Sequence, residues 1–316
     1  MSSCTREKAM KAMLLMGHGG PEMLRYGEAP DPIAGPGDVV VDIHAASVNA
    51  ADYKVRLGSG RSSLQFPYIL GRDFSGVVSA VGAGVTDLAV GDGVFGVLDQ
   101  GHEGAYAEKV AIKAAIIAKK PDNLGHAEAA ALALTGLTAV WALEDTAHLR
   151  AGETILIQGG AGGVAGFAIQ LAKHLGATVI TTASASNHDY VRRLGADRVI
   201  DYRSEDFTKL VSNCDVVFDT VGGEVQVRSY EVLKPGGRLV WVAAAPDGFQ
   251  PSRKDVQTLR PGVARDRAHL ERILALLAVG AVWPPNIVHY TLADAAEAHR
   301  VSESRHLQGK LVFAVR

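Results

Sequence analysis

The residues of this sequence with the clearest chemical signature are the glycines of segment 158–165, which reads Gln-Gly-Gly-Ala-Gly-Gly-Val-Ala. Gly160, Gly162 and Ala165 satisfy the pattern G-x-G-x-x-G/A. In this pattern the first glycine permits a tight turn, the second lets the backbone approach a pyrophosphate, and the small third residue allows close packing of a helix on a strand. The phosphates would lie at the positive end of the helix. The turn therefore predicts dinucleotide binding, with contacts from Gly160, Ala161, Gly162, Gly163 and Val164.

The sequence on either side of the turn has the pattern that such a site requires. Residues 154–157, Thr-Ile-Leu-Ile, predict a strand buried on both faces. After the turn, apolar residues recur at the spacing of one helix face, and Gly176 follows as a stop. A glycine-rich turn without a ligand is the alternative, and the flanking strand and helix make it the weaker one.

The composition indicates a globular chain with enough residues for two hydrophobic cores. Of 316 residues, 47% are hydrophobic and 21% are charged, with a formal net charge of -2. This balance provides no long-range attraction for nucleic acid or an anionic membrane, so we expect neither as a partner. Two cysteines, Cys4 and Cys214, are too few for a disulfide framework. Cys214 is most simply a small core residue.

We predict no targeting or membrane-spanning segment. The first residues lack the apolar core of a signal peptide. No uninterrupted apolar run approaches the roughly 18 residues of a membrane span. We therefore expect a cytoplasmic protein.

Two patterns divide the chain. From about residue 12 to residue 112, short β runs alternate with turns that contain Gly and Pro, which predicts an all-β, barrel-like unit. From about residue 123, strands alternate with helices, which predicts a parallel sheet with helices on both faces. Beyond about residue 246 the sequence carries two helical patterns and a final β run at 310–315.

Nine further segments of the chain carry a family resemblance. They are 18–22, 47–54, 71–78, 82–85, 134–139, 161–164, 194–197, 218–223 and 234–237. In this order they resemble the medium-chain dehydrogenase/reductase superfamily, and more narrowly its zinc-free quinone oxidoreductase (zeta-crystallin-like) branch. The resemblance implies an α/β protein with three parts: a GroES-like β-barrel catalytic domain at 1–122, a Rossmann domain with a doubly wound parallel sheet at 123–260, and a segment 261–316 that returns to complete the catalytic domain. It also implies an active site between the domains.

The end of the second predicted strand of the Rossmann domain bears on the choice of cofactor. NAD enzymes commonly place an acidic residue there, but here Thr182 and Ser184 are followed by no carboxylate until Asp189. Tyr202 resembles the tyrosine that lies against the 2′-phosphate in NADPH-using relatives. Relatives often carry a Lys near position 186, where this chain has Ser. We predict NADPH rather than NADH.

Other residues of this half are assigned from the same resemblance. Thr135 resembles the family residue near the nicotinamide, with a helix-start cap as its alternative role. Val221 follows a strand and should line the same crevice. Arg192 and Arg203 are equally consistent with phosphate contacts and with solvated surface charges.

No metal site is expected. Zinc-dependent relatives use Cys, His and Glu ligands. Here Asn49 stands where the family's first Cys falls, and Gly71-Arg72-Asp73 replaces the family's Gly-His-Glu. Arg72 and Asp73 are expected to form a structural ion pair in place of the metal, with a catalytic role as the alternative.

Without a Lewis acid, reduction of a conjugated acceptor is easier to support than alcohol oxidation. A hydride adds to a quinone or enone, and hydrogen-bond donors stabilise the charge that develops on the carbonyl oxygen. The family places segment 49–54 at the substrate cleft, which makes Asn49, Tyr53 and Lys54 the candidate donors. Tyr53 is the first choice for a polarising or proton-supplying group, and a packing role is its alternative.

The sequence therefore predicts an NADPH-dependent, zinc-independent reductase of quinones or α,β-unsaturated carbonyls. A 2-enoyl thioester reductase is the second possibility, and its carrier would favour a basic entrance that could draw on Arg56, Arg61 and Arg72. A non-enzymatic NADPH-binding protein is the third. A homodimer that pairs through an edge strand of the Rossmann sheet is expected from the resemblance. The run 237–243 would suit such an edge, and a buried interior strand is its alternative.

Overall fold

The computed structural model describes residues 9–59, 63–99, 101–251, 253–262 and 264–316. The chain forms two compact units. Unit 1 comprises residues 1–134, 265–271 and 286–316, and unit 2 comprises residues 135–264 and 272–285. The chain passes between the units at 134/135, 264/265, 271/272 and 285/286, whereas the sequence suggests limits at 122/123 and 260/261.

The first boundary lies inside helix α2 (His126–Val140) because the two parts of that helix pack in different units. Near its start, Ala130 belongs to an apolar cluster of unit 1 that includes Val312. Further along, Gly136 packs so tightly in unit 2 that a Cβ would lie 2.7 Å from Ile273 Cδ1. Periodicity marks such a helix but does not reveal that its packing partners change.

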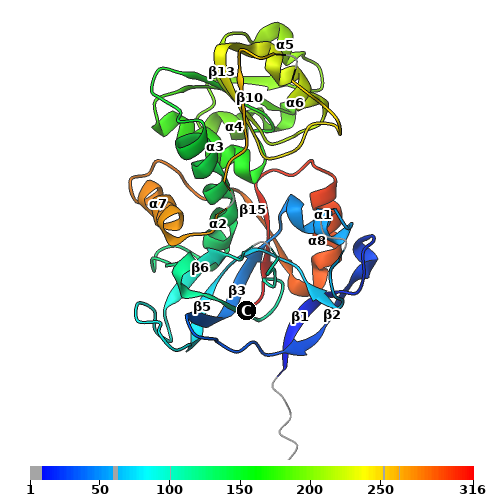
Figure 1. The fold of residues 1–316 in the computed structure, drawn as a ribbon, viewed down its shortest axis with the longest axis vertical. Helices are drawn as coiled ribbons and strands as arrows, with labels where there is room; N and C mark the ends of the chain where they lie inside the picture. Colours follow the sequence, from blue (N-terminus) through cyan, green and yellow to red (C-terminus); the bar gives the residue numbers. More distant parts are fainter. Residues whose placement is uncertain (1–8, 60–62, 100, 252, 263) are drawn as a thin grey trace, which may run out of the picture. The chain divides into compact units, whose positions relative to one another are not determined.

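Unit 1 is built on two sheets (Figure 1). The larger, seven-stranded sheet has the order β15-β16-β3-β5-β6-β8, with β7 also paired with β3, and the smaller has the order β2-β1-β4. Val312 of β16 lies opposite Ser47 of β3, so the last strand of the chain extends the sheet begun near its start. The strands are β1 (Ala9–Leu15), β2 (Leu24–Pro30), β3 (Asp38–Ser47), β4 (Tyr68–Ile69), β5 (Asp73–Val81), β6 (Gly93–Val97), β7 (Lys109–Lys113), β8 (Ile117–Lys119), β15 (Ile287–Thr291) and β16 (Lys310–Ala314).

Two helices belong to unit 1 alone, α1 (Ala50–Arg56) and α8 (Ala295–Glu303). Arg56 at the end of α1 is completely buried. Its guanidinium donates to Gly19 O, to His299 Nδ1 at 3.2 Å, and pairs with Glu303. The side chain therefore joins α1, α8 and the N-terminal segment.

Unit 2 has a six-stranded sheet in the order β11-β10-β9-β12-β13-β14. Every described pairing in it is parallel. Helices α3 and α4 contact β9 to β11, and α6 contacts β12 and β13. These features confirm the predicted Rossmann fold. The elements are β9 (Thr154–Ile157), α3 (Gly163–His174), β10 (Thr178–Ala183), α4 (His188–Arg193), β11 (Arg198–Asp201), α5 (Phe207–Leu210), β12 (Cys214–Asp219), α6 (Glu224–Ser229), β13 (Leu233–Trp241), β14 (Gln257–Leu259) and α7 (Arg267–Ala278), whose first residues lie in unit 1.

Strand β13 contains the run 237–241 that could have formed a sheet edge. It is an interior strand, because β12 pairs with it on one side and β14 on the other. The edges of this sheet are β11 and β14. A buried interior strand and an apolar edge strand have the same side-chain pattern, so only the pairing could distinguish them.

Helix α2 continues as a π-helix over Trp141–Thr146. The combined helix, His126–Thr146, has 21 residues and is apolar enough to span a membrane by length and composition, although 72% of the apolar window is buried in the structure. This burial matches that of a core helix of a globular protein.

The position of Cys214 generates a prediction about its reactivity. The residue starts β12 within the core of unit 2, and burial raises the pKa of its thiol to about 12. At mildly alkaline pH the thiol should be protonated and inaccessible. In a Cys4→Ser variant, Cys214 should not react with a chromogenic disulfide reagent until denaturant is added. Labelling of the folded variant at the rate of a free thiol would contradict this placement.

Candidate active site and cofactor turn

The predicted dinucleotide turn joins β9 to α3. Gly159 is the residue in the left-handed region, with a φ of +75°, so the tight turn precedes the position that the fingerprint gives it. Gly160 is required for a different reason, because a Cβ there would lie 2.2 Å from Thr181 Oγ1. Gly162 is the N-cap of α3, and Gly163 and Val164 are its first residues. Amides in the first turn of a helix have no partner within the helix, so this one can bind an anion.

A chain of hydrogen bonds between polar side chains supports the glycine turn. Gly159 N donates to Thr182 Oγ1 at 3.1 Å, and the Thr182 hydroxyl donates to Gln158 Oε1 at 2.8 Å. Gln158 Nε2 in turn donates to Ser229 Oγ at 3.1 Å. Thr182, predicted to bind the cofactor, is buried and its hydroxyl is engaged with the protein. Its observed role is to support the glycine turn, and Gln158 is a supporting residue that the sequence interpretation missed.

The strand order reverses between β9 and β12, where a doubly wound sheet binds its ligand. Thr220 Oγ1 donates to Gln158 O at 2.8 Å, which links the loops that follow these two strands. Val221 N donates to Asp219 Oδ1 at 2.9 Å, and a Cβ on Gly159 would lie 3.0 Å from a Val221 methyl. The structure therefore brings Val221 and the glycine turn together, and the role of Val221 toward a cofactor stays a prediction.

The residues predicted to recognise the cofactor's phosphate also lie at the carboxyl end of the sheet strands. Ala183 of β10 is paired with Asp201 of β11, so Ser184 and Tyr202 are the next residues on two adjacent parallel strands. Ser184 is buried and accepts a hydrogen bond from Asn187 Nδ2 at 3.0 Å. Tyr202 is 50% exposed.

The charged residues Arg192, Arg203 and Asp201 each have a contact within unit 2. The Arg203 guanidinium lies 5.9 Å from the centre of the Tyr202 ring. Arg192 is exposed and pairs with Asp189 at 3.3 Å. Hydrogen bonds from the Arg203 backbone and the Ser204 hydroxyl lower the pKa of Asp201. Contacts with Tyr202 and Asp189 thus account for both arginines, and their role toward phosphate stays a prediction.

Thr135 lies well inside α2, because the helix begins at His126. The alternative role of Thr135 as a helix-start cap is therefore wrong. The side chain is buried.

In unit 1, Asn49 belongs to a buried polar network. It is the N-cap of α1, and its backbone N–H donates to Asp52 Oδ2 at 2.8 Å. The Asn49 amide donates from Nδ2 to Asp73 Oδ1 at 2.7 Å, and Oδ1 accepts from Lys310 Nζ at 2.7 Å. Asp73 Oδ2 also accepts from Ser47 Oγ at 2.7 Å. Both polar atoms of the Asn49 side chain are thus engaged with the protein.

Arg72 and Asp73 do not follow the expected pairing. Arg72 pairs with Asp52, at 3.9 Å from Nε to Oδ1, and with Glu103, at 3.3 Å from Nη2 to Oε1. Asp73 is bonded to Asn49 and Ser47 instead. Arg72 directly precedes β5 and Asp73 is its first residue, and the two side chains have different partners.

Asp52 lies at the centre of these charges and is fully buried. Burial raises the pKa of its carboxyl to about 6, and Asp73 adds to the rise while Arg72 opposes it. The Tyr106 hydroxyl donates to Asp52 Oδ2 at 2.8 Å. The phenol that contacts this network is therefore Tyr106, which the sequence interpretation did not single out.

Tyr53 and Lys54 lie on α1, directly after this network. Tyr53 is 5% exposed, and Lys54 is half-buried. Both catalytic and packing roles for Tyr53 are compatible with this burial.

The sequence suggests three arginines for a basic entrance to the site of a thioester reductase, and the described ones point elsewhere: they are bonded inside unit 1. Arg56 is buried and bonded to Gly19, His299 and Glu303, and Arg72 is paired with Asp52 and Glu103. Arg61 lies outside the described residues. The two described arginines therefore serve the interior of unit 1.

The residues at the family's metal positions do not fit a zinc ion. Asn49 Oδ1 already receives an ammonium group, and Arg72 brings a second cation. Within the described part of the chain, no group of three or more His, Cys, Asp or Glu side chains is arranged to hold a metal ion.

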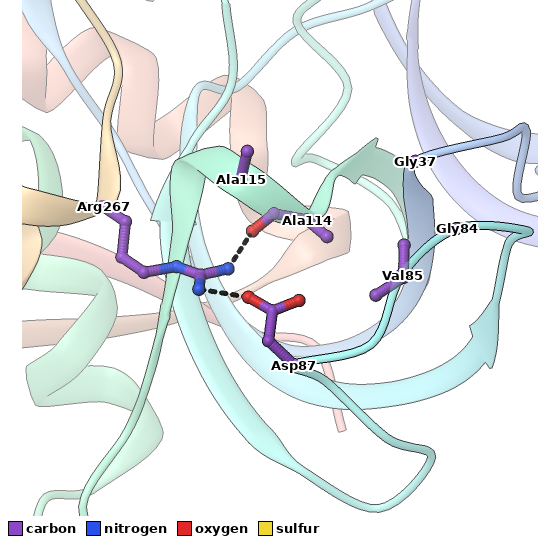
Figure 2. A pocket seen from close by; sticks show the side chains of 7 residues that line it. All are labelled: Gly37, Gly84, Val85, Asp87, Ala114, Ala115 and Arg267. Carbon is purple, nitrogen blue, oxygen red and sulfur yellow. Dashed lines mark hydrogen bonds and ion pairs between the residues drawn. The ribbon is translucent and has the colours of Figure 1, made fainter.

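A pocket of about 340 Å³ in unit 1 is formed by other residues (Figure 2). Arg267 crosses it, donates to Ile117 O at 2.7 Å and to Ala114 O at 2.5 Å, and pairs with Asp87. These contacts fasten the start of α7 to the sheet. None of the predicted site residues lines the pocket, so it is not the candidate active site.

Comparisons with known proteins extend over the whole chain. Residues 35–122 match the family described as the alcohol dehydrogenase GroES-like domain, and residues 194–313 match the family described as zinc-binding dehydrogenase. The structure is similar to that of the quinone oxidoreductase from Coxiella burnetii, with 35% identity, a TM-score of 0.90, and coverage of 98% of this chain and 100% of that one.

Two sequence relatives are also informative. The mitochondrial NAD(P)H oxidoreductase RTN4IP1 of Danio rerio is 31% identical, over 99% of this chain and 93% of its own length. A 2-methylene-furan-3-one reductase of Solanum lycopersicum is 42% identical over 67% of this chain and 57% of its own length. These are oxidoreductases by name. Because similarity to such proteins spans both units, the chain belongs to the medium-chain dehydrogenase/reductase superfamily, in its zinc-free quinone oxidoreductase branch.

Proposed function

We propose that this protein is an NADPH-dependent, zinc-independent reductase of quinones or α,β-unsaturated carbonyls. The observation that carries the proposal is the network at Asn49, which stands where the family's first Cys ligand falls: its amide accepts from the Lys310 ammonium and donates to Asp73. The similarity to a quinone oxidoreductase and to an enone reductase supports the same substrate class.

Unit 2 supplies the residues that would hold the cofactor. The first-turn amides of Gly163 and Val164 would receive the pyrophosphate. Ser184 and Tyr202 would receive the 2′-phosphate, because they follow paired strand residues and the end of β10 carries no carboxylate. Thr135 and Val221 would border the nicotinamide end. When bound, the dihydronicotinamide supplies a hydride.

Unit 1 supplies the groups that would act on the acceptor. Negative charge develops on the substrate oxygen as its carbonyl system is reduced, and a positioned donor lowers the barrier. The Asn49 amide is held by Lys310 and Asp73, so Tyr53 and Lys54 are the better candidates for direct donation. We assign the Tyr53 hydroxyl as the principal donor and the Lys54 ammonium as a second.

For assembly, we propose a homodimer through an edge of the unit 2 sheet. The edge nearest the predicted run is β14, since β13 is paired on both sides. Light scattering coupled to gel filtration gives the mass directly, and a monomer at micromolar concentration would reject this assembly.

The first prediction here concerns substrate and metal. Purified protein treated with a chelator should oxidise NADPH on addition of 1,4-benzoquinone, 9,10-phenanthrenequinone or a simple 2-alkenal, because no step requires a metal ion. Crotonyl-CoA is the discriminating arm. Preference for the thioester would move the assignment to enoyl reductase, and tight NADPH binding without turnover of any acceptor would favour a binding protein.

The second prediction concerns cofactor choice. Ser186 is exposed, and its hydroxyl lies 3.2 Å from Ser184 Oγ. Ser186→Lys should raise kcat/KM for NADPH and Ser186→Asp should lower it, each by about fivefold, because an exposed charge near a phosphate contributes about 1 kcal/mol. Values for NADH should change little. Thr178→Lys and Thr178→Asp, at the opposite end of β10, are matched controls. Equal effects on kcat/KM for NADPH and NADH would argue against binding of the 2′-phosphate near Ser186.

The third prediction concerns Tyr53. Tyr53→Phe removes only the hydroxyl and should lower kcat by about 10²-fold, the typical contribution of a positioned proton donor. Binding of NADPH, followed by its fluorescence, should be unchanged. Tyr106→Phe is a comparison variant, because that hydroxyl is bonded to Asp52. An unchanged kcat in Tyr53→Phe would assign the ring to packing.

A further inference from the structure

Lys310 is a buried lysine whose position the proposed mechanism does not yet explain. It begins β16, directly after Gly309, and is 4% exposed. The next three residues of β16 are buried and apolar, so an apolar side chain at position 310 would also be compatible with the strand. An ammonium in such a place has a large desolvation cost unless partners compensate it.

The partners of Lys310 are all close to the candidate active site. Its Nζ donates to Val48 O at 2.7 Å and to Asn49 Oδ1 at 2.7 Å. Burial lowers the pKa of Lys310, and the carboxylates of Asp73 and Asp52 oppose this effect. The ammonium is thus stabilised by the same two acids that surround Asn49.

The contacts of Lys310 determine the orientation of the Asn49 amide. The amide oxygen faces the ammonium and the amide nitrogen faces the Asp73 carboxylate, at 2.7 Å each. A flipped amide would oppose N–H groups to the ammonium and oxygen to the carboxylate, and both contacts would become repulsive. Since Asn49 is also the N-cap of α1, this orientation fixes the start of the helix that carries Tyr53 and Lys54.

We propose that Lys310 is a positioning residue for this active site, and that its buried ammonium fixes the orientation of the Asn49 amide. The inference rests on the proposed reductase function. Lys310 acts through Asn49 and α1, and it does not need to touch the substrate. A substitution should therefore affect kcat far more than cofactor binding, because unit 2 contains the residues that would hold the cofactor.

The test is a double-mutant cycle of Lys310→Met and Asn49→Ala, with kcat, KM, NADPH affinity and thermal stability measured for each folded variant. Lys310→Met should lower kcat by about 10²-fold, the effect of a small misplacement of a reacting group. The NADPH dissociation constant should stay within about twofold. In the Asn49→Ala background, Lys310→Met should change kcat by no more than about twofold, because the two residues act together.

Two further variants separate positioning from general stability. Lys310→Arg retains the charge and should be more active than Lys310→Met. Lys109→Met is the matched control, because Lys109 lies on β7 of the same sheet and pairs with Asp31, away from Asn49. It should keep the wild-type kcat.

The outcomes are distinguishable. Independent, multiplicative effects of Lys310→Met and Asn49→Ala, or a kcat loss that only follows the loss of folded protein, would overturn the positioning role. A wild-type protein that turns over no acceptor would instead reject the proposed function, and with it any catalytic step that Lys310 could position. If Lys310→Met cannot be purified folded, Lys310→Arg and Asn49→Ala still test the positioning role. An unchanged kcat in both variants would overturn the proposal.

Discussion

The buried charges of unit 1 are the constraint on which the candidate active site depends. Asp52, Asp73 and Glu103 are opposed by Arg72 and Lys310, and isolated charges of this kind would be too costly to bury. Each is compensated by a residue from a different part of the chain: Asp52 lies on α1, Asp73 on β5 and Lys310 on β16. The Lys310 part of the network therefore depends on the pairing of β16 with β3, which brings the last strand of the chain beside the first residues of the site.

In unit 2 the glycine turn is held by neutral polar side chains rather than by charges. A glycine turn that leaves amides free for an anion must be held by other contacts, and here Gln158, Thr182 and Thr220 hold it. These side chains are bonded to the protein rather than directed to a ligand. The predicted cofactor residues therefore divide into those that would contact the cofactor, such as Gly163 and Val164, and those that shape the turn, such as Thr182.

The contacts of Lys310 differ in chemistry from those of a catalytic metal ion. A zinc ion can activate an alcohol as its alkoxide, whereas an ammonium bonded to Val48 O and Asn49 Oδ1 provides fixed charge and orientation. Reduction of a conjugated carbonyl needs the latter, because a nearby donor can stabilise the oxygen as the hydride arrives. Arg267 is another cation of unit 1 whose contacts are structural. Its guanidinium is engaged with Ala114, Ile117 and Asp87 and fastens the start of α7 to the sheet.

Local sequence by itself determined the glycine turn, the parallel character of the second half and the β-rich character of the first, because each depends on periodicity and on residues close together in the chain. The family motifs added the identity of the two folds. Tertiary structure alone decided that α2 is divided between units, that β13 is an interior strand, that Arg72 pairs with Asp52 and Glu103, and that Lys310 reaches Asn49. These features depend on contacts between residues far apart in sequence, and a lysine at the start of an apolar strand gives no local sign of the carboxylates that will surround it.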